Sequence, residues 1–155
     1  MPSAWSLRQS VPADASWIAE LRADVMRPDL ERLGRWDPAR ARQRFRNGFH
    51  PAYTFVIEVA GSSAGVISVR PEPDEQWIEH FYLAPEFQGR GLGSEVLRHV
   101  MMTQGDHRPF RLNVLQGSAA RRLYERHGFV HEHEDAIDVF LVADADRVAS
   151  SARSR

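Results

Sequence analysis

The spacing of hydrophobic positions divides the chain into strand-like and helix-like segments. Apolar residues alternate with polar ones, or run together briefly, at 4–8, 53–59, 64–70, 77–83, 110–115, 129–133 and 137–142. Apolar residues three and four positions apart predict helices at 12–28, 30–47, 91–103 and 118–127. Pro28 is expected to end the first helix, and Gly34 to break the second before a restart at Asp37-Pro38. Gly128 is expected to cap the last helix.

This order, β-α-α-β-β-β-α-β-α-β-β, predicts a mixed α/β (α+β) fold. Helices stand between strands, but the hairpin signal at Gly61-Ser62-Ser63 interrupts them. We therefore expect a mixed, mostly antiparallel central sheet with helices on both faces. Residues 1–143 are expected to form one domain. Residues 144–155, rich in Asp, Ala, Ser and Arg, are expected to form a flexible tail.

Composition removes several kinds of chemistry. The 155 residues include no cysteine, which excludes disulfides, thiolate metal sites and cysteine nucleophiles. They also include no lysine, so Schiff-base chemistry and a P-loop lysine are excluded. Any phosphate bound here must therefore be held by backbone N–H groups and arginines.

Charge and hydropathy bear on partners and location. No apolar run approaches the 18 residues of a membrane-spanning helix, and no basic, then apolar, leader opens the chain. We expect a cytoplasmic protein without a membrane partner. The net charge of −1 disfavours a nucleic-acid partner. The arginines between Arg40 and Arg46 could suggest an RNA-binding helix, but they also fit a solvated amphipathic helix with Phe45 turned inward.

The stretch with the clearest chemical meaning follows the 77–83 strand. Leu83-Ala84-Pro85 ends that strand, and the sequence QGRGLGS at residues 88–94 precedes a helix. Glycines let the backbone approach a ligand, and the free N–H groups and dipole of a helix N-terminus favour an anion. The glycine spacing and the lack of a following acidic residue differ from the dinucleotide-binding fingerprint.

This stretch resembles the acyl-CoA pyrophosphate loop of the GNAT superfamily of N-acetyltransferases, Gln/Arg-x-x-Gly-x-Gly/Ala. The segment LNVLQGSAARRLYERHGF, residues 112–129, is similar to that family's second motif, a strand and a helix ending in Leu-Tyr and then Gly-Phe. The resemblance implies a sheet splayed between the Trp77–Leu83 and Phe110–Leu115 strands, with the pantetheine arm of acetyl-CoA in the splay.

The resemblance also assigns residues to the cosubstrate acetyl-CoA. The backbone of Leu83 would contact the pantetheine, and Ser118 stands where the family usually has an asparagine that contacts it. Because serine is shorter, Ser118 could instead serve only as a helix N-cap. Arg90 could contact a phosphate or be solvated. The residues that would hold the pyrophosphate are Gln88, Gly89, Arg90, Gly91, Leu92, Gly93 and Ser94.

Two residues would carry the chemistry. Tyr124 matches the family tyrosine that protonates the departing CoA thiolate, although its spacing also fits a core tyrosine. An amine must lose a proton before or during attack, and Glu79 and His80 are candidate bases. Alternation places Glu79 with Phe81, and His80 with Tyr82. The resemblance places the Glu79 face toward the acceptor, so Glu79 is preferred; deprotonation by solvent remains open.

The resemblance implies transfer of an acetyl group from acetyl-CoA to a primary amine of unknown identity. The alternative is a non-catalytic acyl-CoA-binding or regulatory domain on the same fold. Asp24, Asp29, Glu31 and Trp36 could line an acceptor pocket or be surface charges beside a core tryptophan. Residues 131–135, HEHED, suggest a metal cluster, but alternation favours a polar hairpin edge and no metal. A homodimer is left open.

Overall fold

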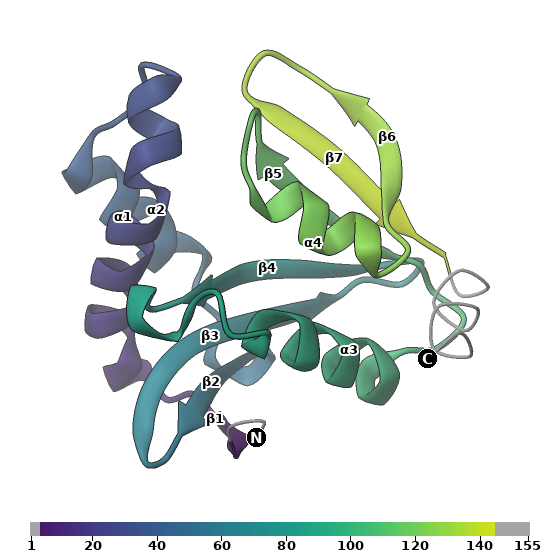
Figure 1. Cartoon of the computed structure of the whole chain (residues 1–155), viewed down its shortest axis with the longest axis horizontal. Helices are drawn as coiled ribbons and strands as arrows, with labels where there is room; N and C mark the ends of the chain where they lie inside the picture. Colours follow the sequence, from purple (N-terminus) through teal and green to yellow (C-terminus); the bar gives the residue numbers. More distant parts are fainter. Residues whose placement is uncertain (1–3, 145–155) are drawn as a thin grey trace. The chain divides into compact units, whose positions relative to one another are not determined.

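The computed structural model describes residues 4–144, so the predicted tail lies outside the described residues except for Asp144. The observed element order is the predicted one, with three short 3-10 helices added (Figure 1). The strands are β1 Trp5–Gln9, β2 Thr54–Val59, β3 Ser62–Pro71, β4 Gln76–Leu83, β5 Phe110–Leu115, β6 Val130–Glu134 and β7 Asp138–Ala143. The helices are α1 Ala15–Arg32, α2 Pro38–Gly48, α3 Leu92–Gln104, α4 Ala120–Arg126, and the 3-10 helices η1 Pro12–Asp14, η2 Pro51–Tyr53 and η3 Pro85–Phe87.

The seven strands form one mixed sheet in the order β1-β2-β3-β4-β5-β7-β6. The pairs β1–β2, β2–β3, β5–β7 and β6–β7 are antiparallel, whereas β4 and β5 run parallel. The predicted mixed, mostly antiparallel sheet is therefore confirmed. Within the described range, the β4–β5 register comprises Gln76 with Phe110 and Trp77 with Arg111. The splay of these two strands beyond Trp77 stays a prediction.

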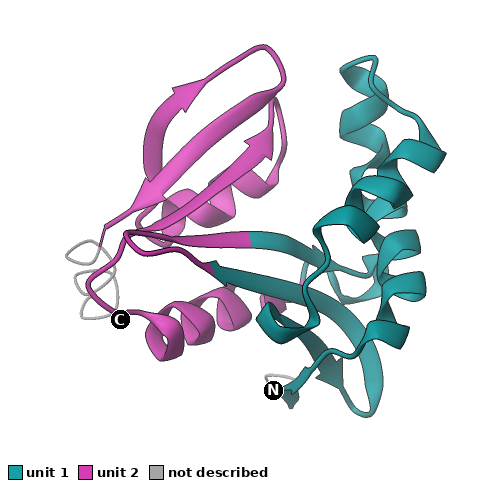
Figure 2. Cartoon of the chain, turned by 180° about the vertical axis from the view of Figure 1, so that it is seen from behind, with its two compact units in different colours: residues 1–70, 79–89 teal, residues 71–78, 90–155 magenta. Residues whose placement is uncertain are grey.

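The chain groups into two compact units (Figure 2). Unit 1 holds residues 1–70 and 79–89, and unit 2 holds residues 71–78 and 90–155. Strand β4 begins in unit 2 and ends in unit 1. The assignment of residues 1–143 to one domain stays a prediction.

In unit 1, α1 and α2 pack on the face of the sheet that carries Val66 of β3. Ile18 and Ala19 of α1 and Phe45 of α2 are fully buried together with Val66. Tyr82 of β4 packs against this cluster. Burying a large apolar side chain stabilises a fold by roughly 1.5–3 kcal/mol, so this contact fixes both helices on β3 and β4.

The prediction that Pro28 ends the first helix is wrong. Helix α1 passes through Pro28 and ends only at Arg32. A proline inside a helix removes one N–H donor, and that loss destabilises the helix without necessarily ending it. The chain leaves the helix at Gly34, whose φ is +69°. The predicted restart is confirmed: the Asp37 side chain accepts a hydrogen bond from the Arg40 N–H at the start of α2.

In unit 2, β5 and β7 bury one shared face. Leu112 lies opposite Leu141 and Val114 opposite Val139, and all four are nearly inaccessible to solvent. Helix α4 lies across this part of the sheet in both ribbon views (Figures 1 and 2). The described part of the chain contains no helix that is long and apolar enough to cross a membrane.

Candidate functional site

The loop between β4 and α3 has the backbone geometry of an anion-binding turn. After η3, Gly89 and Gly91 adopt φ values of +75° and +81°, a region that favours glycine. A Cβ on either glycine would meet no described atom within 4 Å, so the space beside both is open. The Glu95 N–H donates to the Gly91 carbonyl at 3.1 Å at the start of α3. The N–H groups of residues 92–94 precede this bond and have no partner within the helix.

Gln88 ties the start of this loop to the end of β4. Its side-chain Nε2 donates to the Leu83 carbonyl at 2.8 Å. The N–H of Ala84, the residue after Leu83, donates to the Ala64 carbonyl of β3 at 2.8 Å. The strand end is therefore fixed by both a side chain and a backbone bond. The roles of Leu83 and Gln88 toward acetyl-CoA stay predictions.

A buried histidine holds the first turn of α3. The Ser94 Oγ lies 2.8 Å from the His127 Nε2, and His127 is only 3% exposed. His127 follows the last residue of α4. His127 is the last residue of the predicted helix 118–127 and was not predicted as a site residue. The signal available in the sequence was a polar residue near the apolar positions of that helix, since a buried polar side chain requires a hydrogen-bond partner.

Tyr124 and Ser118 lie on or beside α4, also in unit 2. Tyr124 is 7% exposed, and its ring packs edge-on against Phe129 with 5.6 Å between ring centroids. The Ser118 Oγ accepts a hydrogen bond from the Ala120 N–H at 3.2 Å. Ser118 thus satisfies a backbone donor at the start of α4, and its contact with a cofactor stays a prediction.

Glu79, the preferred base, makes an ion pair with Arg70 of the neighbouring strand. The Glu79 Oε1 accepts hydrogen bonds from Arg70 Nε at 3.2 Å and Nη2 at 3.1 Å. Both side chains are about 30% exposed. Arg70 was not predicted as a site residue, because a partner on an adjacent strand has no local signal in the sequence.

His80 interrupts the regular alternation of β4. Its φ of +47° is rare for a residue with a bulky side chain. Its ring packs edge-on against Phe45, and its Nδ1 lies 3.4 Å from the Tyr82 hydroxyl. The expected grouping of His80 with Tyr82 fits these contacts. The expected grouping of Glu79 with Phe81 relies on alternation across His80, where the strand is irregular.

The surroundings of His80 and Tyr82 set their charge. Burial lowers the pKa of His80, aided by the nearby positive charge of Arg22, and the ring is neutral at neutral pH. Burial also raises the pKa of Tyr82, whose hydroxyl accepts a hydrogen bond from Arg22 Nε at 3.2 Å. Both groups are thus held uncharged inside unit 1.

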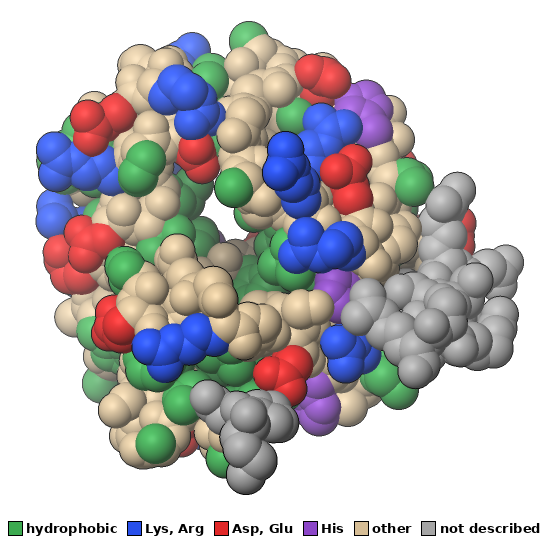
Figure 3. All heavy atoms as spheres, in the orientation of Figure 1, with side chains coloured by type: hydrophobic (Ala, Val, Ile, Leu, Met, Phe, Trp, Pro, Cys, Tyr) green, Lys and Arg blue, Asp and Glu red, His purple; other side chains and the backbone are tan. Residues whose placement is uncertain are grey.

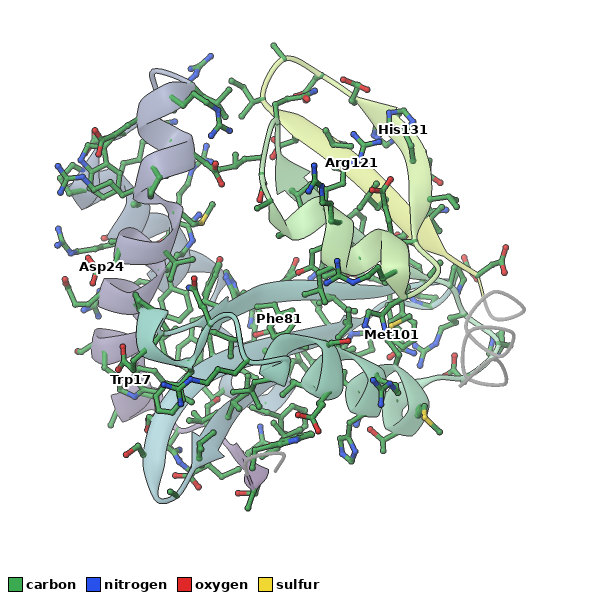
Figure 4. All side chains as sticks on the ribbon, viewed as in Figure 1. Trp17, Asp24, Phe81, Met101, Arg121 and His131 are labelled. Carbon is green, nitrogen blue, oxygen red and sulfur yellow. The ribbon has the colours of Figure 1, made fainter. Side chains whose placement is uncertain are left out.

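Two of the three acidic residues of α1 proposed for an acceptor pocket, Asp29 and Glu31, pair with arginines of the same helix. Glu31 pairs with Arg27 at 2.5 Å, and Asp29 pairs with Arg32 at 2.6 Å. The Arg27 guanidinium also lies 5.2 Å from the centre of the Trp36 ring. Asp24 is exposed on α1 (Figure 4). These contacts favour the interpretation of these acids as surface charges.

The arginines of α2 belong to a surface of mixed charge. Arg42 makes two hydrogen bonds with Glu20 of α1, at 2.6 and 3.0 Å. Acidic and basic side chains are interspersed over this side of the molecule (left of Figure 3). This arrangement fits a solvated amphipathic helix whose Phe45 is buried.

The β6–β7 hairpin carries the HEHED segment at an exposed edge. His131, labelled in Figure 4, pairs with Glu134 at 2.9 Å, while Glu132 pairs with Arg111 of β5. The His133 Nδ1 lies 3.7 Å from the Glu132 Oε1, and its ring stacks on Phe140 with 4.3 Å between ring centroids. Within residues 4–144 no three His, Asp or Glu side chains converge as a metal site. The hairpin residues thus have partners in ion pairs and ring packing.

Comparison with known proteins identifies the family of this chain. Residues 50–131, more than half of the chain, match the profile of the acetyltransferase (GNAT) domain. A search of curated proteins found no match. Many solved structures resemble this chain, and the similarity of fold extends to proteins of low sequence identity.

Three of these structures cover nearly all of both chains. The PaiA N-acetyltransferase from Thermoplasma acidophilum, in complex with coenzyme A, has a TM-score of 0.71 at 16% identity and covers 91% of this chain and 99% of its own. An N-acetyltransferase from Staphylococcus aureus Mu50 has a TM-score of 0.69 at 19% identity, covering 89% and 100%. The ribosomal-protein-S18-alanine N-acetyltransferase from Escherichia coli has a TM-score of 0.67 at 17% identity, covering 92% and 94%. With the family profile spanning the loop, α3 and α4, the chain belongs to the GNAT family of acetyltransferases.

Proposed function

We propose that the chain transfers the acetyl group of acetyl-CoA to a primary amine while both substrates are bound. The observation that carries this proposal is the open glycine turn at residues 88–91, which leads directly into the first turn of α3 in a chain of the GNAT family. Support also comes from the PaiA relative, whose structure contains coenzyme A. An amine acceptor accords with the names of the relatives, which are N-acetyltransferases.

The loop would bind acetyl-CoA through its pyrophosphate. The N–H groups of Leu92, Gly93 and Ser94 can donate to phosphate oxygens, and the α3 dipole favours their negative charge. Gly89 and Gly91 leave the space that a phosphate needs. Arg90 is exposed and could add a charge-assisted hydrogen bond. The Leu83 backbone would direct the pantetheine, and the side chain of Gln88 keeps the Leu83 carbonyl in position.

Tyr124 and Glu79 would handle the protons. The amine nitrogen attacks the thioester carbon, and Glu79 accepts a proton from that nitrogen directly or through water. The carbon–sulfur bond then breaks, and Tyr124 donates its hydroxyl proton to the sulfur of the departing CoA. Arg70 holds the Glu79 carboxylate in one orientation through two hydrogen bonds to the same oxygen.

A catalytically silent acyl-CoA-binding domain is the alternative. A panel of primary amines, including amino acids, polyamines and peptide N-termini, tests the choice through release of the CoA thiol from acetyl-CoA. We expect release that depends on one class of amine and equals the amount of acetylated product found by mass spectrometry. Binding of acetyl-CoA without release in any reaction would support the silent domain instead.

A further inference from the structure

The contact between Ser94 and His127 joins two segments 33 residues apart within unit 2. Ser94 is the third residue of α3, and His127 directly follows α4. The Ser94 Oγ and His127 Nε2 are 2.8 Å apart, a full-strength hydrogen-bond distance. His127 is 3% exposed, so its ring is held by the protein rather than by solvent.

The backbone around His127 is also fixed. The His127 N–H donates to the Tyr124 carbonyl at 2.9 Å, and the Phe129 N–H donates to the same carbonyl at 3.2 Å. The Gly128 N–H donates to the Glu125 carbonyl at 3.2 Å. These bonds close the end of α4, so the ring of His127 extends toward Ser94 from a rigid position.

The direction of the hydrogen bond decides what Ser94 can do. A hydroxyl has one hydrogen, and a neutral imidazole has one N–H that can be on either nitrogen. If Ser94 donates to Nε2, its hydrogen is used. If the Nε2–H of His127 donates to Ser94 Oγ, the serine hydrogen is free for another acceptor. A phosphate oxygen at the start of α3 accepts hydrogen bonds and donates none, which favours the second arrangement.

We propose that His127 is a positioning residue for the acetyl-CoA pyrophosphate: its Nε2–H donates to Ser94 Oγ, and the Ser94 hydroxyl then donates to a phosphate oxygen. The proposal rests on the proposed function, which places the pyrophosphate at the loop. His127 acts through Ser94 and does not touch the reacting atoms. Its contribution is to bias a rotatable hydroxyl toward the one orientation that an anion can use.

A double-mutant cycle measured by titration calorimetry with CoA tests this relay. A hydrogen bond to a charged group contributes about 1.5–3 kcal/mol, so Ser94→Ala should weaken CoA binding about 10-fold or more. His127→Leu removes only the neutral hydrogen bond that orients the hydroxyl, worth about 0.5–1.5 kcal/mol, so it should weaken CoA binding about 2- to 10-fold. The double variant should bind no more weakly than Ser94→Ala alone. His127→Gln, whose amide can donate from nearly the same place, should restore most of the affinity. His107→Gln, at a histidine whose side chain is 87% exposed in the same unit, is the control and should bind CoA as the parent does.

A measurement on the parent protein covers the case in which a variant does not fold. In the CoA complex, the ¹⁵N NMR shifts of the His127 ring should show a proton on Nε2. An unprotonated Nε2 in that complex would overturn the proposal, as would His127→Leu effects that add fully to those of Ser94→Ala. A parent that binds no CoA would refute the proposed function itself, whereas normal CoA binding by His127→Leu would refute only this inference.

Discussion

Asp14 shows how one carboxylate can anchor several segments. It accepts hydrogen bonds from Arg8 Nη1 and Nη2 at 2.9 Å each, from the Val11 N–H at 2.8 Å and from Trp17 Nε1 at 2.8 Å. The Arg8 guanidinium is the main reason that the pKa of Asp14 falls far below its usual range. The Asp14 side chain is only 8% exposed, so this charge is essential to the junction of β1 and α1.

Replacing Asp14 by asparagine keeps its size but removes its charge. We expect Asp14→Asn to lower the free energy of unfolding by about 2 kcal/mol at neutral pH. Because the folded-state pKa of Asp14 is lowered, its contribution is complete above the unfolded pKa of about 3.9 and is lost as the pH falls through the folded value. Urea unfolding at several pH values should therefore show a deficit that shrinks below about pH 4. Glu20→Gln, in an exposed ion pair, should show almost no deficit at any pH.

Tyr124 provides the test of leaving-group protonation. Tyr124→Phe removes one hydroxyl and keeps the ring against Phe129. Since general acids typically contribute about 10²–10⁴-fold, kcat should fall by that order while the Kd of acetyl-CoA changes little. Tyr53→Phe, at a tyrosine that is 39% exposed on η2, should leave turnover unchanged. Turnover equal to that of the parent in Tyr124→Phe would return this residue to a purely structural role.

A pair of matched substitutions tests whether Glu79 or His80 acts as the base. Glu79→Gln should lower kcat/KM at neutral pH, and the deficit should shrink at high pH, where more of the amine is already unprotonated. His80→Gln should retain most of the rate, because the His80 ring contacts Phe45 and Tyr82. The reverse result would assign the base to His80. Unchanged pH profiles for both variants would leave deprotonation to solvent.

At the scale of elements, the sequence predicted those whose signals are local. The helix start at Asp37-Pro38 and the glycine turn before α3 depend on a few adjacent residues, and both are found. The passage of α1 through Pro28 was missed, because packing of Ile18 and Ala19 on the sheet stabilises the helix beyond its local propensity. The irregularity at His80 was also missed, since it depends on contacts with α2.

The approach of β3 to β4 depends on Gly65. A Cβ at Gly65 would lie 2.2 Å from the Tyr82 carbonyl oxygen, a backbone atom that cannot move aside easily. We expect Gly65→Ala to destabilise the protein by about 2 kcal/mol in urea unfolding, a typical result of overpacking. Gly48→Ala is the matched control, because its Cβ would meet only the His80 side chain, at 3.6 Å. Equal stability of the two variants would show that β3 and β4 can separate without loss.

At the scale of the whole molecule, the sequence predicted the local parts of the candidate site but not the contacts between separate elements. The loop at 88–94 builds its geometry from its own backbone, so the sequence alone identifies it. The contacts of Ser94 with His127 and of Glu79 with Arg70 join separate elements and required the structure. The acids of α1 carry the negative charge that suits a pocket for a cationic amine. The pairing of Glu31 with Arg27 and of Asp29 with Arg32 depends on the helix continuing past Pro28, which the sequence did not predict.

The central claim is that this GNAT chain binds acetyl-CoA through the loop at residues 88–94, and titration calorimetry with CoA tests it most directly. The parent should bind CoA. A CoA concentration a hundredfold above the Kd should raise the free energy of unfolding of the parent by about 2.7 kcal/mol. Gly91→Val should bind no CoA, because a β-branched residue strains the φ of +81° and fills the open space beside the loop. Full CoA affinity in a folded Gly91→Val variant, or no affinity in the parent, would contradict the account.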